Sequence, residues 1–257
     1  MMPVAGSVHL EYWYVVFEIA VSPLFSLLQA ASLGQPHAIL AGGERYFSHR
    51  SAGPADRVVQ QELKEAGLGE KRDYLEFVEL VTVVQRAAVE FYGWVAGVDG
   101  DYGVLVASLG RRAVCLVRRG DCVRFTRCAA DRMVETLVGR LPDVAAADGG
   151  SITVGHDEFH AVPGGLMRRS TTRPDGARRL DALLDTRRLH IAKLYAARRD
   201  DDGNRRRSEQ WVSVLDLVDG RWVLGVTQAR HERWISAGPG TPRVIAGRLG
   251  ALARSIR

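Results

Sequence analysis

Lysine and cysteine are both scarce in this chain of 257 residues. Lysine occurs only at positions 64, 71 and 193, so arginine supplies almost all of the 35 basic residues. The three cysteines, Cys115, Cys122 and Cys128, have no CxxC spacing. Their number and spacing indicate neither a zinc knuckle nor a disulfide scaffold. Reduced, mostly buried cysteines are typical of cytoplasmic proteins, so we expect a cytoplasmic location.

Long uninterrupted hydrophobic runs are also missing. The most apolar stretch, residues 8–40, is broken by polar, proline and glycine residues at His9, Glu11, Glu18, Pro23, Gln29 and Gly34. Because a bilayer-spanning helix needs about 20 residues with few charges, this stretch does not qualify and we expect no membrane insertion. Residues 1–7 lack the basic region of a signal peptide, so nothing in the sequence predicts export.

The sequence has no recognisable catalytic motif. We find neither a GxxxxGK[ST] loop, nor a GxGxxG loop after a strand, nor a GxSxG nucleophile elbow. Asp216, a lone acidic residue on a predicted strand, is expected at a surface-facing alternate position. We therefore expect no enzymatic activity and no cofactor.

His156 and His160 are four residues apart and could share a metal ion on a helix. The zincin pattern requires Glu directly after the first histidine, but Asp157 stands there. Pro163-Gly164-Gly165 would end a helix within a turn, and no third ligand is evident. A metallohydrolase built on this pair remains a minor alternative, and we expect no metal.

The charge pattern gives little support for nucleic-acid binding. The net charge is +5, and the arginines are scattered among 30 acidic residues, whereas nucleic-acid-binding proteins concentrate positive charge on one face. The exception is the polar segment 198–209, in which Arg205-Arg206-Arg207 could hold phosphate or an acidic partner. Asp200 to Asp202 balance that charge, which favours a self-compensating loop at a hairpin tip. An Arg-rich nucleic-acid-binding protein remains the alternative function.

A pattern in the middle of the chain recurs in its last third. Gly110-Arg111 and Gly220-Arg221 each precede an apolar run, a charged turn and a second short run. A helical segment follows, containing Gly139-Arg140-Leu141 in the first copy and Gly247-Arg248-Leu249 in the second. The matching motifs are separated by about 110 residues. This duplication predicts a pseudo-symmetric α+β scaffold with halves at residues 1–148 and 149–257 that form one domain.

The periodicity of hydrophobic residues predicts where helices and strands lie. Strands are predicted at 89–98, 102–109, 113–117 and 122–126, and again at 189–197, 211–218, 221–227 and 231–236. Helices are predicted at 54–67, 73–88, 129–141, 177–186 and 244–256. Residues 8–17 fit either a strand or the start of a helix running through Leu28.

Within residues 208–256, an Arg-rich hairpin precedes Val212-Ser213-Val214-Leu215-Asp216, Asp219-Gly220-Arg221-Trp222, Trp234-Ile235-Ser236, and Pro242 with a Leu/Ala/Arg helix. The first part of the chain contains Leu10-Glu11-Tyr12, and Asp56-Arg57 through Leu63 to Gly67-Leu68. These residues resemble the EspG family, the cytosolic chaperones of type VII (ESX) secretion. The resemblance is strongest over residues 208–256, and the earlier residues resemble the N-terminal helices of the family.

The resemblance implies a pseudo-two-fold α+β fold with a central, largely antiparallel sheet and two helical bundles. It also implies a non-enzymatic function: binding the hydrophobic tip of helical PE–PPE-like secretion substrates in the cytosol and targeting them for export. A curved sheet flanked by helices would offer a broad apolar face for such a tip. The protein itself is expected as a monomer or homodimer.

Candidate partner-binding residues come from the second half of the chain. Three of the five tryptophans lie there on predicted strands or beside them, and large apolar strand residues are usually buried, so the core is the favoured alternative for them. The candidates are Trp211, Trp222, Trp234, Val244, Leu249, Arg205 and Arg206.

Overall fold

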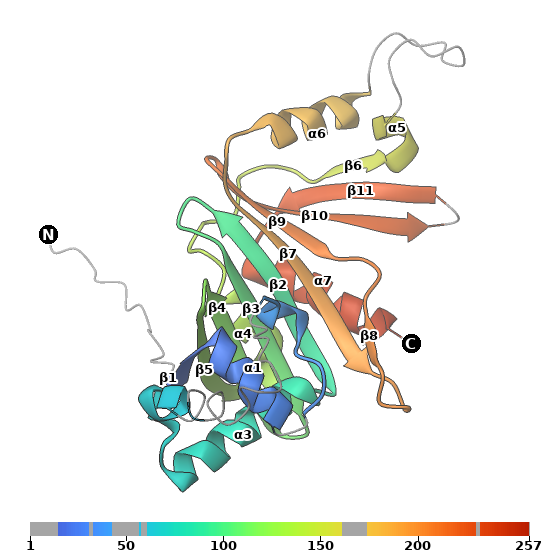
Figure 1. The fold of residues 1–257 in the computed structure, drawn as a ribbon. Helices are drawn as coiled ribbons and strands as arrows, with labels where there is room; N and C mark the ends of the chain where they lie inside the picture. Colours follow the sequence, from blue (N-terminus) through green and yellow to red (C-terminus); the bar gives the residue numbers. More distant parts are fainter. Residues whose placement is uncertain are drawn as a thin grey trace, which may run out of the picture.

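The computed structural model describes residues 15–30, 33–42, 57, 61–160, 174–229 and 232–256. Its main feature is an 11-stranded sheet with the order β1-β5-β4-β3-β2-β7-β9-β10-β11-β6, with β8 paired to β7 (Figure 1). The first group of strands is β1 (Val15–Ala20), β2 (Val89–Gly97), β3 (Tyr102–Leu109), β4 (Arg112–Arg119) and β5 (Cys122–Ala129). The second group is β6 (Ile152–Gly155), β7 (Arg188–Arg199), β8 (Arg205–Arg207), β9 (Val212–Leu217), β10 (Gly220–Ala229) and β11 (Glu232–Pro239).

The described helices are short or of medium length. They are α1 (Val21–Ala30), α3 (Lys71–Gln85), α4 (Met133–Val138), α5 (His156–His160), α6 (Asp175–Asp185) and α7 (Pro242–Ser255), with single turns at η1 (Ala38–Leu40), η3 (Lys64–Leu68) and η4 (Ala130–Arg132). Among them, none combines the length and the hydrophobicity that crossing a bilayer requires. All pairs between the named strands are antiparallel, which confirms the predicted α+β class with its largely antiparallel sheet.

The two groups of strands join at the pair β2–β7. Nine register partners link these strands, from Val89↔Arg198 to Gly97↔His190. They approach closely at Gly93, where an added Cβ would lie 2.3 Å from the carbonyl oxygen of Lys193, so a larger residue would push the strands apart. The central pair therefore makes one continuous sheet of the two groups.

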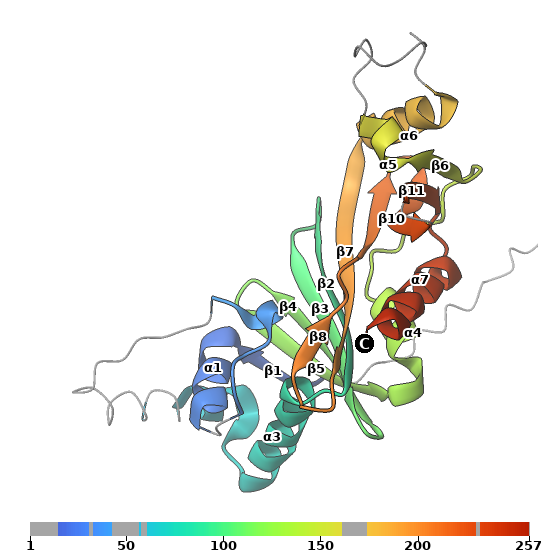
Figure 2. The same cartoon turned by 90° about the vertical axis from the view of Figure 1, so that its right-hand side faces the viewer.

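The side chains of β7 show how the helices cover this sheet, because alternate residues point to opposite faces. Ala192, Leu194 and Ala196 pack on one face in a cluster that includes Ile245 and Leu249 of α7. On the opposite face, Ala197 and Tyr195 pack with α1 and α3, whereas Ile191 packs with α6. The first face is covered by α4 and α7 together, and the second by helices at its two ends (Figure 2).

The order of elements is the same in both groups of strands. A four-strand meander (β2-β3-β4-β5, then β7-β9-β10-β11) is followed by a helix, α4 or α7, and an earlier strand pairs with the last strand of each meander. Gly110 lies in the turn between the second and third strand of the first meander, and Gly220 begins the third strand of the second meander directly after the corresponding turn. The repeated motif thus falls at equivalent positions. A pseudo-two-fold relation between the halves, and the boundary at residue 148, stay predictions.

Several predicted elements differ from the observed ones. The ambiguous N-terminal segment forms a strand at 15–20 and then a helix, and its first part lies outside the described residues. The predicted helix at 129–141 is reduced to η4 and α4. The helix predicted at 73–88 is α3, which runs from Lys71 to Gln85. The polar loop at 198–209 continues the sheet, since Arg205–Arg207 pair with β7 as β8. The start of the helix predicted at residue 54 and the turn at Pro163 lie outside the described residues.

Candidate partner-binding face

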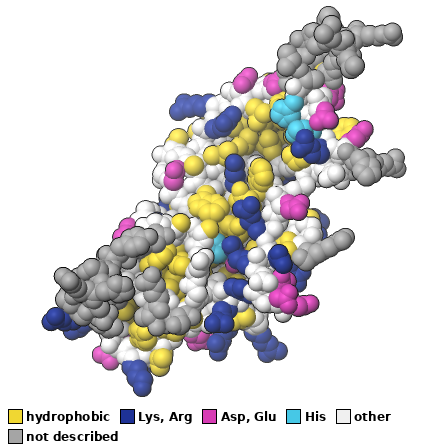
Figure 3. Space-filling model, turned by 45° about the vertical axis from the view of Figure 1, so that its right-hand side comes forward, with side chains coloured by type: hydrophobic (Ala, Val, Ile, Leu, Met, Phe, Trp, Pro, Cys, Tyr) yellow, Lys and Arg dark blue, Asp and Glu magenta, His cyan; other side chains and the backbone are white. Residues whose placement is uncertain are grey.

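Among the described elements, none covers one face of the sheet between α1/α3 and α5/α6. Hydrophobic side chains gather there, with Lys and Arg side chains beside them and histidines at the upper end (Figure 3). Trp94 is 41% exposed, Trp211 44% and Val226 37%, which is unusual for large apolar strand residues. We call this surface the open face; it consists of Trp94, Lys193, Tyr195, Arg207, Trp211, Ser213, Leu224, Val226 and Ile235.

Four aromatic side chains cross the open face from β2 to the start of β9. The rings of Tyr92 and Tyr195 are cross-strand partners and stack with centroids 5.5 Å apart. Trp94 meets Tyr195 edge-on at 6.1 Å, and Trp211 lies 6.2 Å from Tyr195 on the other side. Tyr92 is buried beneath the others, so this aromatic row is anchored in the core and rigid. Rigid aromatic side chains lose little conformational entropy when a partner covers them.

Three cations lie over this aromatic row. The Arg205 guanidinium is 5.0 Å from the Tyr92 ring centre and that of Arg207 is 5.1 Å from Tyr195, both within cation–π range. The Lys193 ammonium is 5.6 Å from the Trp211 ring. Burial raises the pKa of Tyr92 above its usual value, although the positive charges of Arg205 and Arg207 partly oppose this shift. The face is therefore both apolar and positively charged.

At the α5 end, the open face is hollowed. The hollow has a volume of about 230 Å³ and is lined by Trp211, Leu224, Val226, Ile235 and both histidines of α5. The His156 and His160 rings lie 4.5 Å apart, but an Arg233 guanidinium nitrogen is 3.1 Å from His156 Nδ1. A guanidinium at this place opposes the binding of a metal cation. Within the described part of the chain, no group of three or more potential ligands gathers at any point.

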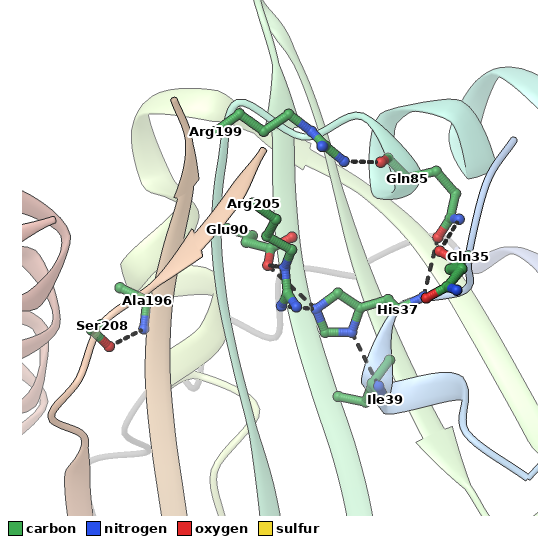
Figure 4. Close-up of polar contacts among 9 residues, drawn as sticks. All are labelled: Gln35, His37, Ile39, Gln85, Glu90, Ala196, Arg199, Arg205 and Ser208. Carbon is green, nitrogen blue, oxygen red and sulfur yellow. Dashed lines mark hydrogen bonds and ion pairs between the residues drawn. The ribbon is translucent and has the colours of Figure 1, made fainter. Parts of the chain in front are cut away.

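A buried polar cluster supports the hairpin next to the open face (Figure 4). Glu90 on β2 is 3% exposed and accepts a hydrogen bond from Arg205, which reaches over from β8. His37 Nδ1 accepts the backbone N–H of Ile39 at 3.1 Å, and its Nε2 lies 3.4 Å from the same carboxylate and 2.6 Å from an Arg205 guanidinium nitrogen. Burial opposes ionisation of Glu90, but the hydrogen bonds and charges of His37 and Arg205 outweigh it, so the pKa of Glu90 lies below its usual value.

Gln85, at the end of α3, holds the loop that carries His37. Its side-chain oxygen accepts the backbone N–H of His37 at 3.2 Å, and its amide donates to the carbonyls of Leu33 and Gln35. The Arg199 guanidinium, from β7, donates to the backbone carbonyl of Gln85 (Figure 4). The cluster therefore joins the N-terminal segment to the β7–β8 hairpin of the second group of strands.

A second buried ion pair corrects the prediction for Asp216. This residue is 2% exposed, and both of its carboxylate oxygens accept from Arg221, at 2.6 and 2.9 Å. Its strand position does face away from the open face, but α4 and α7 cover the sheet there and leave no solvent-facing side. Asp216 and Arg221 are cross-strand partners on either side of the turn that contains Asp219. Their five-residue spacing around this turn was the feature of the sequence that could have predicted the ion pair.

Comparison with known proteins identifies the family. A model of the EspG family matches residues 21–251. The chain belongs to the EspG family. A sequence search of curated proteins found no match.

The solved structures include a protein of similar fold. It is the type VII secretion system chaperone EspG5 of Mycobacterium tuberculosis, determined in complex with a PE25–PPE41 dimer. The TM-score is 0.63 at 16% sequence identity, and the alignment covers 93% of this chain and 96% of EspG5. At this identity the match establishes a shared fold over nearly the whole length of both chains.

The seven candidate residues of this EspG-family protein do not lie on one surface. Trp222 and Leu249 are buried, at 7% and 0% exposure, and belong to the core, which was the favoured alternative. Val244 is exposed on α7, and Trp234 is half-buried on the face opposite the open face. Only two candidates, Trp211 and Arg205, reach the open face or its edge.

The arginine run on β8 is mostly engaged within the protein. Arg205 is held by Glu90, and Arg206, on the opposite face of the hairpin, binds Asp200 at 2.8 Å. Two of its three charges are therefore neutralised by nearby carboxylates, but only Arg206 pairs with the acidic run Asp200 to Asp202 on which the prediction relied. This pairing weakens the alternative of a nucleic-acid-binding surface.

Sequence reasoning missed Lys193 and Tyr195 as candidates, named Arg207 only as part of the run Arg205-Arg206-Arg207, and treated Trp94 only as one tryptophan among five. The signal was available in part, because Ile191, Lys193 and Tyr195 alternate along one face of a predicted strand. What was missing was the knowledge that α1/α3 and α6 stop short of the middle of that face.

Proposed function

We propose that this EspG-family protein is a cytoplasmic chaperone of type VII secretion that binds helical PE–PPE-like substrates through the open face. The observation that carries the proposal is an exposed aromatic and aliphatic sheet surface in a fold shared with EspG5, a chaperone solved with a PE–PPE dimer. Contiguous apolar surface of this kind typically marks a protein-binding site. Covering the tip of a helical substrate there would keep both surfaces from aggregating.

The open face is suited to binding a partner, and this function does not require catalysis. The aromatic row offers rigid contact area, the usual source of binding hot spots. Of the charged groups beside it, Glu90 and Arg205 are bound to each other, whereas Lys193 and Arg207 lie over aromatic rings. We therefore infer an adaptor without enzymatic activity.

The test is co-expression of the full chain with PE–PPE-type pairs from the same genome, followed by size-exclusion chromatography with light scattering. A complex is expected with at least one pair. Trp211→Ala should weaken it by about tenfold or more, because this residue lies at the middle of the open face. Failure of every well-expressed pair to co-elute would contradict the proposal.

Leu75→Ala is the matched control. Leu75 is also a large exposed apolar residue, at 55%, but it lies on α3 away from the open face. It should leave the complex unchanged. Equal loss of binding in both variants would mean that the open face is not the binding site.

A further inference from the structure

Ion pairs neutralise arginines at many places in the described part of this protein. Besides the pairs already described, carboxylates accept from arginines near α3 and β5 in the pairs Arg112–Glu79, Arg124–Glu18 and Arg127–Glu76. On the open face the pattern differs. Lys193 and Arg207 are exposed and have no carboxylate partner among the described residues; each lies instead over an aromatic ring.

The same face is nearly free of acidic side chains. Of the described strand positions that point to this side from β2 to β11, only Glu90 carries a carboxylate, and it is buried and bound by Arg205. The acidic residues of α5, Asp157 and Glu158, lie beside β11, three strands away from β7. The charges of Lys193 and Arg207 are therefore not matched by an exposed carboxylate at these strand positions.

The spacing of the two cations limits what can meet them. Lys193 and the register partner of Arg207, Ala197, are four residues apart on β7, which is roughly 13 Å along the strand. Tyr195 lies between them. An occupant that contacts the aromatic row would thus have apolar atoms at its centre and its polar groups near one or both cations.

We propose that the open face selects a helical partner whose tip combines aliphatic side chains with carboxylates that pair with Lys193 and Arg207. A partner that excludes water from this face must compensate both charges, since burying an unpaired charge is costly. A carboxylate on the partner compensates the positive charge of Lys193 or Arg207, whereas an amide or a second cation does not. This inference rests on the proposed function for its choice of a helical partner, and adds the charge that the partner carries.

The first test uses a PE–PPE-type pair that forms a complex with the full chain. Lys193→Glu and Arg207→Glu should each weaken binding by about tenfold at low salt, and binding of the unaltered protein should weaken as NaCl is raised. Arg198→Glu is the matched control, because it makes the same charge change on the opposite face of β7, and it should have no effect. Unchanged affinity in both open-face variants would overturn the proposal.

The second test does not depend on any natural substrate. Two helical-hairpin peptides with the same leucine-rich turn, one flanked by glutamates and the other by lysines, are titrated against the full chain by tryptophan fluorescence. The glutamate peptide should bind at least tenfold more tightly, and Lys193→Glu with Arg207→Glu should remove that preference. Equal binding, a preference for lysine, or no binding of the glutamate peptide would overturn the inference.

The two tests separate the two proposals. If no PE–PPE pair binds while the glutamate peptide does, the proposed function fails and the inference about charge stands. If a PE–PPE pair binds but neither charge reversal nor salt matters, the function stands and the charge inference fails.

Discussion

At the scale of single residues, Glu90 shows how a buried charge organises the surroundings of the open face. Its carboxylate forms an ion pair with Arg205 of β8 and lies beside His37 of the N-terminal segment. Three parts of the chain that are distant in sequence therefore meet at this carboxylate. A buried carboxylate is stable only when such partners satisfy it. Arg205 thereby holds the hairpin that places Arg207 over Tyr195.

Glu90→Gln should lower the free energy of unfolding at pH 7 by about 2 kcal/mol, because Arg205 loses its buried countercharge. The pKa of Glu90 is depressed in the folded protein from a usual value of 4.5. Its contribution is therefore present above about pH 4.5 and is lost as the pH falls below that value. Chemical denaturation from pH 7 to pH 3 should show a smaller acid-induced loss of stability in Glu90→Gln than in the unaltered protein.

Glu76→Gln provides the control for this prediction. Glu76 pairs with Arg127 at 2.9 Å, but both side chains are at least one-third exposed, so removing the pair should change stability by less than about 1 kcal/mol. If the free energy of unfolding falls by the same amount from pH 7 to pH 3 in Glu90→Gln and in the unaltered protein, the role assigned to Glu90 is wrong.

At the scale of elements, α7 closes the face of the sheet opposite the open face. Thr241 begins the helix by accepting the backbone N–H of Val244 at 3.2 Å, and Pro242 occupies its first turn. Ile245 and Leu249, one turn apart, face the sheet and are fully buried. This helical periodicity is what holds α7 against β7 and β9.

Leu249→Ala should reduce the free energy of unfolding by about 3 kcal/mol, because it leaves a cavity between α7 and the sheet. Val244→Ala on the same helix, where the side chain is 40% exposed, should change it by no more than about 0.5 kcal/mol. Urea denaturation of both variants measures the contrast. Similar effects at the two positions would contradict the packing described for α7.

At the scale of the whole molecule, the two groups of strands share too much structure to be independent. The β2–β7 pair joins them in one sheet, and α7 packs with strands of both groups in a single cluster. The Glu90 cluster and the contact of Asp99 with His190, at 3.1 Å, also connect the first group to the second. Residues 1–148 and 149–257 are therefore proposed as halves of one domain.

Calorimetry of the full chain should accordingly show a single unfolding transition. Each half, expressed alone, should fail to give a cooperative transition, because it would expose the central strand pair and part of the core. Two resolved transitions in the full chain, or cooperative folding of an isolated half, would show that the halves are separate domains.

Much of the fold could be predicted because strand periodicity and turn residues are local signals. Both four-strand meanders were located to within a few residues, and Gly110 and Gly220 lie at or directly after equivalent turns. The candidate site was harder to predict. Trp211 and Trp222 have similar local sequence settings, yet one is 44% exposed and the other 7%.

By itself, the sequence determined the α+β class, the repeated meanders and the family, because all three follow from patterns of neighbouring residues. Only the tertiary structure decided which tryptophans are exposed, why Asp216 is buried and that Arg205 is bound to Glu90. The physical reason is that burial depends on where α1, α3, α6 and α7 end above the sheet. Those end points bring together residues far apart in the chain, and they leave the open face uncovered.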